Sequence, residues 1–303
     1  MTEEQQKSLL DRVADWWESE DSHKLADKDS ARHDKDQNIR VDLKKFELEK
    51  WTEQRIEILE ILWGRGTRIP GDEKLNRELF GGVGLNSKSK ILDMAVGLGN
   101  CARIITKDSF AHIDVVEAHP NLLPHLIKVI KEEKLSRFIS ILDGDLTKVK
   151  LKRAKYDLIY GREAMFKIED KNFILKKCLK ALSSHGHLIF TDFVLDRDAA
   201  SYDIFKNWSE REKSIVYPIS KGAYNHMFNT LQMQLYPTMD YSKQYVHHVN
   251  IGWQRLERHL KTHKIDEEFV DVMAQESDLW LSRVRSLRSG NLKLLKFHSV
   301  IQK

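Results

Sequence analysis

The chain has 303 residues and a net charge of +4, so it is long enough for one α/β domain with additions or for two small domains. Its pI is about 8.8, and its lysines and acids are interspersed, which does not favour a nucleic-acid partner. Two cysteines, Cys101 and Cys178, provide no disulfide framework and fit a reducing cytoplasm. No apolar run approaches the roughly 20 residues that span a bilayer, and the polar N-terminus is unlike a signal peptide.

Two amphipathic helices are predicted before the first strand. Apolar residues recur at helical spacing over 5–18 and again over 41–63, while the stretch 20–40 between them is almost wholly polar. We expect residues 1–72 to form a helical cap, with 20–40 as a hinge or lid that has too little apolar surface to pack alone. The alternatives are a dimer interface and a permanent part of the core.

The stretch from Lys90 to Glu117 predicts a strand, a tight turn, a helix and a second strand. An apolar strand ends at Asp93, and a turn with small residues at positions 95, 97 and 99 follows. The second strand ends at Glu117. Small residues let the backbone pass close to a ligand, and the helix N-terminus behind them offers free N–H groups. An acid at the tip of the second strand can accept both hydroxyls of a ribose, so the stretch predicts a site for a nucleoside-bearing cofactor.

Spacing decides which cofactor is expected. A dinucleotide fingerprint needs G-x-G-x-x-G, whereas this turn reads Ala95-x-Gly97-x-Gly99, with Asp93 two positions before its first small residue. The pattern resembles that of S-adenosyl-L-methionine (SAM) methyltransferases, in which the acid faces the cofactor's amino group. A nicotinamide enzyme and a strand–turn–helix without a ligand are the alternatives.

Short apolar strands alternate with helices in the next hundred residues. Strands are predicted at 138–142, 156–160 and 188–190, with helices at 122–133 and 170–182 between them. Such alternation predicts a doubly wound, mostly parallel Rossmann-like sheet, whose ligand lies past the carboxyl ends of the strands. Asp145, Arg162 and Asp192 follow successive strands and are expected there with Asp93 and Glu117.

The C-terminal third is predicted to be mainly helical. Residues 198–234 read mostly as helix, 231–236 alternate like a strand, and 243–262 and 266–288 read as two helices. We expect 198–288 to form a helical insertion on the substrate side of a domain covering 73–303. The alternating tail 292–300 predicts a final strand, reversed as is usual in the methyltransferase fold.

These pieces resemble the phosphoethanolamine methyltransferases and their bacterial small-molecule relatives over roughly residues 60–303. The loop from Trp63 to Asp72 resembles W-G-x-G-x-x-S-P-G-G, and Asp93 to Gly99 resembles D-I-G-C-G-L-G. Residues 161–171 resemble S-R-D-x-x-x-H-I-x-D-K, and 190–193 resemble I-T-D-Y. The C-terminal Trp280, Arg283, Ser289-Gly290 and FHSVIQK are also similar to that group's ending.

The chain departs from the pattern at the positions that carry chemistry. The resemblance implies a histidine where Lys167 stands, an aspartate where Glu163 stands and a serine where Ile69 stands. It also implies a partner tyrosine in the N-terminal helices, yet no tyrosine precedes Tyr156. The phosphobase deprotonation machinery is therefore expected to be missing. Glu163 and Lys167 remain as local candidates for a base, and Lys167 could instead bind an anionic group of the substrate.

We therefore expect an enzyme that transfers a methyl group from SAM to a nitrogen, oxygen or sulfur nucleophile of a small molecule. A non-catalytic SAM-fold protein that binds or regulates a partner is the main alternative. A methyltransferase acting on RNA or protein is less favoured, because no N-P-P-Y-like tetrapeptide follows the fourth strand. Oligomeric state is open, with a dimer allowed, and no metal is expected, although His259 and His263 have a metal-compatible i,i+4 spacing. Cofactor contacts are expected from Asp93, Ala95, Gly97, Gly99, Asn100, Glu117, Ala118, Asp145, Leu146 and Arg162.

Overall fold

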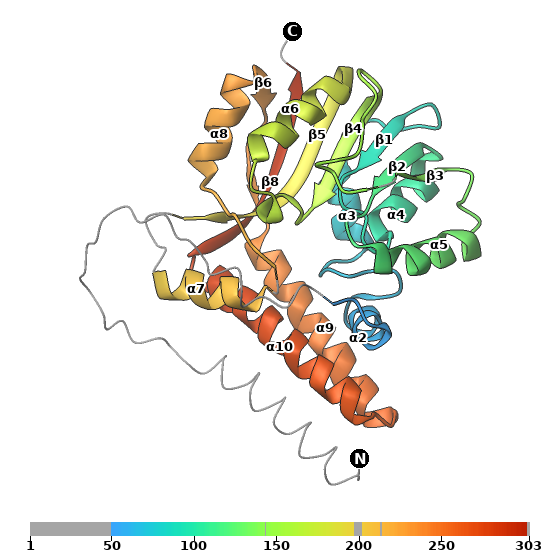
Figure 1. The fold of residues 1–303 in the computed structure, drawn as a ribbon, viewed down its shortest axis with the longest axis vertical. Coiled ribbons are helices and arrows are strands. Elements are labelled where there is room, and N and C mark those ends of the chain that lie inside the picture. The colour runs from blue at the N-terminus through green and yellow to red at the C-terminus, as the bar shows by residue number, and fades with distance from the viewer. Residues whose placement is uncertain (1–49, 143, 197–201, 213, 302–303) are drawn as a thin grey trace.

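The computed structural model describes residues 50–142, 144–196, 202–212 and 214–301. The helix predicted over 5–18, the polar stretch 20–40 and the first part of the helix predicted over 41–63 lie outside the described residues. The proposed division at residue 72 therefore stays a prediction. The described residues form a sheet with helices on both faces and a group of helices beyond one end of it (Figure 1).

A mostly parallel sheet forms the centre of the fold. Its strand order is β3-β2-β1-β4-β5-β8-β6, with β7 also paired to β8. β1 to β5 pair in parallel, whereas β8 runs antiparallel to β5. The strands are β1 (Lys90–Asp93), β2 (His112–Val116), β3 (Ile139–Leu142), β4 (Tyr156–Arg162), β5 (Leu182–Leu195), β6 (Met233–Leu235), β7 (Met239–Asp240) and β8 (Leu292–Ile301). The predicted Rossmann-like fold and its reversed final strand are confirmed.

Helices cover both faces of the sheet. Side chains of α3, α4 and α5 share one core with Ile91 of β1, while those of α6 and α8 share a second core with the neighbouring Leu92. Both residues are fully buried, as expected for a strand covered on its two faces. The helices are α3 (Glu73–Phe80), α4 (Asn100–Ser109), α5 (Leu123–Glu132), α6 (Lys171–Ala181) and α8 (Lys221–Thr230), with short 3-10 turns η2 (Pro120–Leu122) and η3 (Met165–Lys167).

A second group of helices packs together beyond the carboxyl end of β4. It contains α2 (Glu53–Trp63), α7 (Tyr202–Arg211), α9 (Ser242–Thr262) and α10 (Glu267–Arg288) (Figure 1). The ring of Trp63 lies 4.9 Å from that of Trp280 on α10. Trp63 also fills the space above Gly252 of α9, where a Cβ would lie 2.1 Å from the indole. Gly252 therefore lets α2 and α9 approach closely.

Three predicted elements were wrong in extent. The helix predicted from residue 41 is not helical at residues 50–52, and α2 begins after Thr52, whose side chain accepts a hydrogen bond from the Arg55 amide at 3.2 Å. The helix predicted over 198–234 is two helices, because residues 214–220 cross beside β5 and Ser220 then caps α8. The strand predicted at 188–190 is longer, because β5 runs from Leu182 to Leu195 and includes Gly186. A Cβ at Gly186 would lie 2.7 Å from the carbonyl oxygen of Tyr156, so this glycine serves a close strand contact at a register shift.

Within the described residues, no helix is long and apolar enough to cross a membrane. Both cysteines are free and buried. His259 and His263 stack at 3.9 Å near the end of α9, but the described chain brings no group of three or more potential metal ligands together.

Candidate functional site

The glycine turn after β1 is hydrogen-bonded to the residue that follows β2. The strand order changes direction between β1 and β4, which places a crevice beyond the carboxyl end of β1. Gly97 and Gly99 adopt positive φ values of 57° and 92°. The Gly97 amide donates to Oε2 of Glu117 at 2.8 Å, and the His119 amide donates to Oε1 at 2.9 Å. Glu117 thus ties the turn to the end of β2, because each of its carboxylate oxygens accepts from one of these backbone N–H groups.

A pocket with an empty volume of about 350 Å³ lies beside this turn. Asp93, Ala95, Asn100 and Arg162 line it, together with residues 66–69 of the loop before α3. Asp93 is buried, which raises the pKa of its carboxyl to about 7, with Tyr160 and the Ala95 amide as the main opposing groups. Gly99 caps α4 without a side chain, so the first amides of that helix have no side-chain partner at the cap.

The residues present fit a nucleoside-bearing cofactor. The turn offers backbone without Cβ atoms, a helix N-terminus follows it, and each Glu117 oxygen keeps a further lone pair for a hydroxyl donor. Not every predicted contact lies here. Ala118 is exposed after Glu117, Asp145 binds the Thr147 amide at 2.7 Å, and Leu146 is buried against the core on the α6 face. Of the predicted contacts, Asp93, Ala95, Asn100 and Arg162 line the pocket, whereas Gly97, Gly99, Glu117, Ala118, Asp145 and Leu146 do not.

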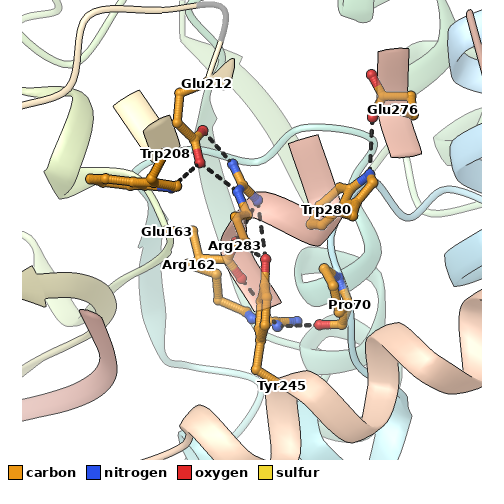
Figure 2. Close-up of polar contacts among 9 residues, drawn as sticks. All are labelled: Pro70, Arg162, Glu163, Trp208, Glu212, Tyr245, Glu276, Trp280 and Arg283. Atoms are coloured by element: carbon orange, nitrogen blue, oxygen red, sulfur yellow. Dashed lines mark hydrogen bonds and ion pairs between the residues drawn. The ribbon is translucent and has the colours of Figure 1, made fainter. Parts of the chain in front are cut away.

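Arg162 fastens the loop before α3 to the end of β4. Its Nη2 donates to the Pro70 carbonyl at 2.6 Å (Figure 2). Its Nη1 donates to Oδ1 of Asn76 at 2.8 Å. The loop approaches so closely that a Cβ at Gly71 would lie 3.2 Å from the guanidinium. A Cβ at Gly97 would lie 2.3 Å from Nε of Arg68, which lies over the cofactor turn. Arg162 therefore shapes the pocket wall while its guanidinium bonds to protein.

A second pocket of about 350 Å³ shares Arg68 and Ile69 with the first. Both predicted catalytic residues, Glu163 and Lys167, line it. Its other lining residues are charged or apolar: Trp51, Arg55, Leu59, Phe166, Glu276, Leu279, Trp280 and Arg283. One loop therefore forms the wall between a pocket beside the cofactor turn and a pocket that holds the catalytic candidates.

Glu163 has an unusual backbone and a buried side chain. Its φ is 52°, a region that costs a non-glycine residue free energy and is often found at functional sites. Oε2 accepts a hydrogen bond from the Tyr245 hydroxyl at 3.1 Å. Oε1 has no hydrogen-bond partner in the described residues, although Nη2 of Arg162 lies 3.7 Å away. Burial raises the pKa of Glu163, opposed by Arg162, Arg283, Tyr245 and Arg68.

Sequence reasoning missed Tyr245 and Glu212. Both lie in the predicted helical insertion, far along the chain from Glu163. Arg283 of α10 donates to both oxygens of Glu212 at 2.6 Å and to the Tyr245 hydroxyl at 3.1 Å (Figure 2). All three side chains are buried. Tyr245 lies on the buried face of α9 and Glu212 directly follows α7, and no local pattern in the sequence says which partner either side chain would meet.

Asp192, predicted at the strand ends, lies behind the second pocket. Its Oδ1 accepts from the Phe166 amide at 2.7 Å and its Oδ2 from the Tyr224 hydroxyl at 2.6 Å. The nearby Lys171 donates to the Ile168 carbonyl at 2.7 Å. Asp192 therefore holds the 3-10 turn that carries Phe166 and Lys167 into the pocket.

A Rossmann-like sheet with a reversed last strand, an acid before a small-x-Gly-x-Gly turn and a second acid on the next strand define a SAM-dependent methyltransferase. A family model described as AdoMet dependent proline di-methyltransferase matches residues 69–245, and the chain belongs to this family. AdoMet is SAM, which is the cofactor.

Relatives with named activities agree with this class. The chain is 24% identical over 191 residues to a phosphoethanolamine N-methyltransferase from Plasmodium falciparum, covering 62% of this chain and 70% of that protein. It is 19% identical over 120 residues to a glycine/sarcosine/dimethylglycine N-methyltransferase from Actinopolyspora halophila, covering 40% of this chain and 21% of that protein.

A solved structure supports the fold. The phosphoethanolamine N-methyltransferase 2 of Haemonchus contortus, in complex with phosphomonomethylethanolamine and S-adenosylhomocysteine, superposes with a TM-score of 0.73 at 17% identity. The match covers 84% of this chain and 59% of the other, so this chain spans less than two thirds of that protein. At this identity the likeness concerns the fold alone.

Proposed function

We propose that the protein transfers a methyl group from SAM to the nitrogen of a small amine, with Glu163 as the group that accepts the acceptor's proton. One observation carries the proposal: the pocket beside the cofactor turn and the pocket that contains Glu163 share a wall made of Arg68 and Ile69. A ligand in each would place a donor and an acceptor next to one another. Oxygen and sulfur acceptors are the other outcomes of the test below.

Nitrogen is favoured by the names of the relatives. The proteins from Plasmodium and Actinopolyspora are both N-methyltransferases, and the family description names proline dimethylation. The second pocket has one group that an amine uses, since the carboxylate of Glu163 can pair with a positive charge. The rings of Trp51 and Trp280 already have the guanidinium groups of Arg55 and Arg283 over them.

The second pocket is lined by more cationic side chains than carboxylates. Arg55 bonds to Glu276 at 2.7 Å, and Arg283 is bound by Glu212, so these two cations are compensated by protein carboxylates. Arg68 makes no hydrogen bond in the described part of the chain. Its guanidinium has the planar donors that carboxylates and phosphates use. We propose that an acceptor with an anionic group would place that group toward Arg68 and Lys167.

When bound, SAM supplies a methyl group on a sulfonium, and the carbon–sulfur bond breaks with its electron pair going to sulfur as the nucleophile bonds to carbon. Asp93 and Glu117 would hold the cofactor by its amino and ribose groups. Oε1 of Glu163 would take one proton from the ammonium form of the acceptor, which leaves the nitrogen lone pair free. Positioned proton transfer and near-attack orientation are the contributions that this chain's residues make.

The remaining expectations are proposals too. We propose a cytoplasmic location, which fits the two free cysteines, and a cap formed by residues 1–72. Of this cap, Trp51 and Arg55 line the second pocket, so it would help to enclose the acceptor and exclude water.

The test is incubation of purified protein and methyl-labelled SAM with a small-molecule extract of cells, followed by mass spectrometry. We expect labelled products that form only with the protein, with the label on nitrogen. Glu163→Gln should slow their formation by about 10²- to 10⁴-fold, the usual contribution of a positioned base. Glu257→Gln is the matched control, because Glu257 is a half-buried residue on α9 that pairs with Lys261 at 2.6 Å and lines neither pocket.

Label found only in the protein or RNA fraction would overturn the small-molecule proposal. Label on small molecules at an undiminished rate in Glu163→Gln would keep methyl transfer and remove the base assigned to it. S-Adenosylhomocysteine binding with no labelled product in any fraction would favour a binding or regulatory role for this chain.

A further inference from the structure

Glu163 lies at one end of a buried chain of polar contacts that reaches three helices. The Tyr245 hydroxyl from α9 donates to Oε2 of Glu163 at 3.1 Å and accepts from Nη1 of Arg283 at 3.1 Å (Figure 2). Nη1 of Arg283 also lies 3.5 Å from Oε2 itself. The hydroxyl therefore connects the carboxylate to the guanidinium.

The far end of this chain is fixed. Nε and Nη2 of Arg283 each donate to one oxygen of Glu212 at 2.6 Å, and the indole N–H of Trp208 donates to Oε1 of Glu212 at 2.6 Å. Both partners of the ion pair are buried. A two-point contact holds the guanidinium plane in one orientation, and that plane then sets the position of the Tyr245 oxygen.

The phenol ring of Tyr245 is also held by packing. It meets the ring of Phe193 edge-to-face, with centroids 5.6 Å apart at 88°. The ring is fully buried, so the hydroxyl has little freedom to turn away from Glu163. Removing the oxygen alone would leave this packing in place.

We propose that Tyr245 is a positioning residue that holds Oε2 of Glu163, so that Oε1 alone accepts the proton from the acceptor. The inference rests on the proposed function, in which Glu163 is the base. Oε1 has no hydrogen bond in the described residues, whereas Oε2 is engaged by Tyr245. The step moves one proton from the ammonium form of the acceptor to Oε1 and leaves the nitrogen lone pair to bond to the methyl carbon.

Tyr245 also keeps the carboxylate ionised. Burial favours the protonated form of Glu163, and a donor to Oε2 favours the charged form. The charged and titratable groups that face Glu163 come from every surrounding element: Arg162 of β4, Arg68 of the loop, Lys167 of η3, Tyr245 of α9, Arg283 of α10 and, through Arg283, Glu212. Of these, Tyr245 can be changed by one atom without altering the net charge.

The test is a pH titration of Glu163 in the S-adenosylhomocysteine complex. The titration is monitored by NMR of protein whose glutamates are labelled at the side-chain carboxyl carbon. The Glu163 signal is assigned by its loss in Glu163→Gln. We expect Tyr245→Phe to raise the titration midpoint of this signal by about one pH unit, the equivalent of one hydrogen bond to a carboxylate. Tyr241→Phe is the matched control, since Tyr241 is a buried tyrosine at the start of the same helix without a hydrogen bond to Glu163.

A midpoint that stays within about 0.2 unit in Tyr245→Phe would overturn the inference, because a tyrosine that only packs would not move it. Arg283→Lys provides a second reading if Tyr245→Phe does not fold. It keeps the charge but loses the two-point contact with Glu212, and it should raise the midpoint in the same direction. Failure of the proposed function gives a different result. The midpoint would shift in Tyr245→Phe while Glu163→Gln still methylated the cell extract at the wild-type rate.

Discussion

Replacement of Glu117 by alanine tests the cofactor turn most directly. In the ligand-free protein, the two Glu117 oxygens accept backbone hydrogen bonds from Gly97 and His119 at 2.8 and 2.9 Å. The side chain is 6% exposed, so these are buried bonds to a charged group. When SAM binds, the remaining lone pairs are expected to accept the ribose hydroxyls. Glu117→Ala therefore removes the ribose acceptor and loosens the turn beneath it.

The size of the expected loss in cofactor affinity follows from the number of hydrogen bonds that Glu117→Ala removes. Hydrogen bonds to a charged group contribute about 1.5–3 kcal/mol each, and part of this contribution is offset because the ligand loses its hydrogen bonds to water. We expect a net loss of about 1–3 kcal/mol, which weakens the binding of S-adenosylhomocysteine by about 5- to 150-fold. The wild-type protein should bind it in the micromolar range, at about −8 kcal/mol, as measured by titration calorimetry.

Two controls separate the ribose contact from the folded state of the turn. Glu117→Gln keeps one carbonyl oxygen as an acceptor and should lose less affinity than Glu117→Ala. Glu257→Ala, at a half-buried position of α9 that lines neither pocket, should leave the affinity unchanged. A folded Glu117→Ala protein with an affinity for S-adenosylhomocysteine within twofold of wild type would refute this reading of the turn. Binding of NAD with no binding of SAM would refute SAM as the cofactor bound at this turn.

Two further predictions follow from other parts of the structure. Phosphoethanolamine should be a poor acceptor, methylated at a rate at least about 10²-fold lower than that of an amine found in the extract experiment. The reasons are that Lys167 replaces a histidine and that Arg283 is already bound by Glu212. Rapid turnover in a methylation assay would contradict this. Burial, with His187 and Lys296 nearby, lowers the pKa of His298 from 6.5 to about 4. The unfolded chain therefore binds more protons between these pH values, so folding stability should fall as the pH drops from 6.5 to 4, and urea unfolding of His298→Gln should show a smaller fall. Equal losses in the two proteins would exclude His298 as the cause.

The cofactor turn was predictable because its signals are local. Asp93, the small residues and Glu117 lie within one strand–turn–helix–strand unit, and the spacing alone specifies close backbone approach to a ligand. The parallel sheet and its reversed last strand were predictable for a similar reason, since alternation of short apolar strands with helices restricts the topology. The structure places the turn beyond the carboxyl end of β1, and the strand order reverses between β1 and β4.

The surroundings of Glu163 were not predictable in the same way. Tyr245 lies 82 positions after Glu163 and Arg283 lies 120 positions after it, so no local pattern relates them. Helical periodicity correctly predicted the two helices that carry these residues, but it did not say which face of each helix is buried. Which buried polar group meets which is decided by how α9 and α10 pack over the end of β4, and that packing depends on contacts such as Trp63 above Gly252. The absence of an early tyrosine was therefore read as a missing group, although α9 supplies a hydroxyl to the same strand end.

The loop between Trp63 and Asp72 couples the two halves of the site. Its residues Arg68 and Ile69 line both pockets, so any movement of the loop changes the cofactor side and the acceptor side together. Several contacts hold it in place: among them, the Gly66 amide donates to Glu60 at 2.7 Å, Arg103 donates to the Arg65 carbonyl at 3.3 Å, and Arg162 donates to the Pro70 carbonyl at 2.6 Å.

These close contacts explain why the loop contains several glycines. Gly64, Gly66 and Gly71 all have positive φ values, and a Cβ at Gly66 would lie 1.7 Å from the Arg103 guanidinium. Arg162 is adjacent in sequence to Glu163, so the residue that fixes the loop also precedes the proposed base. The position of the pocket wall and the position of that base are therefore set by the same strand end, which is why an altered loop residue should affect acceptor binding as well as cofactor binding.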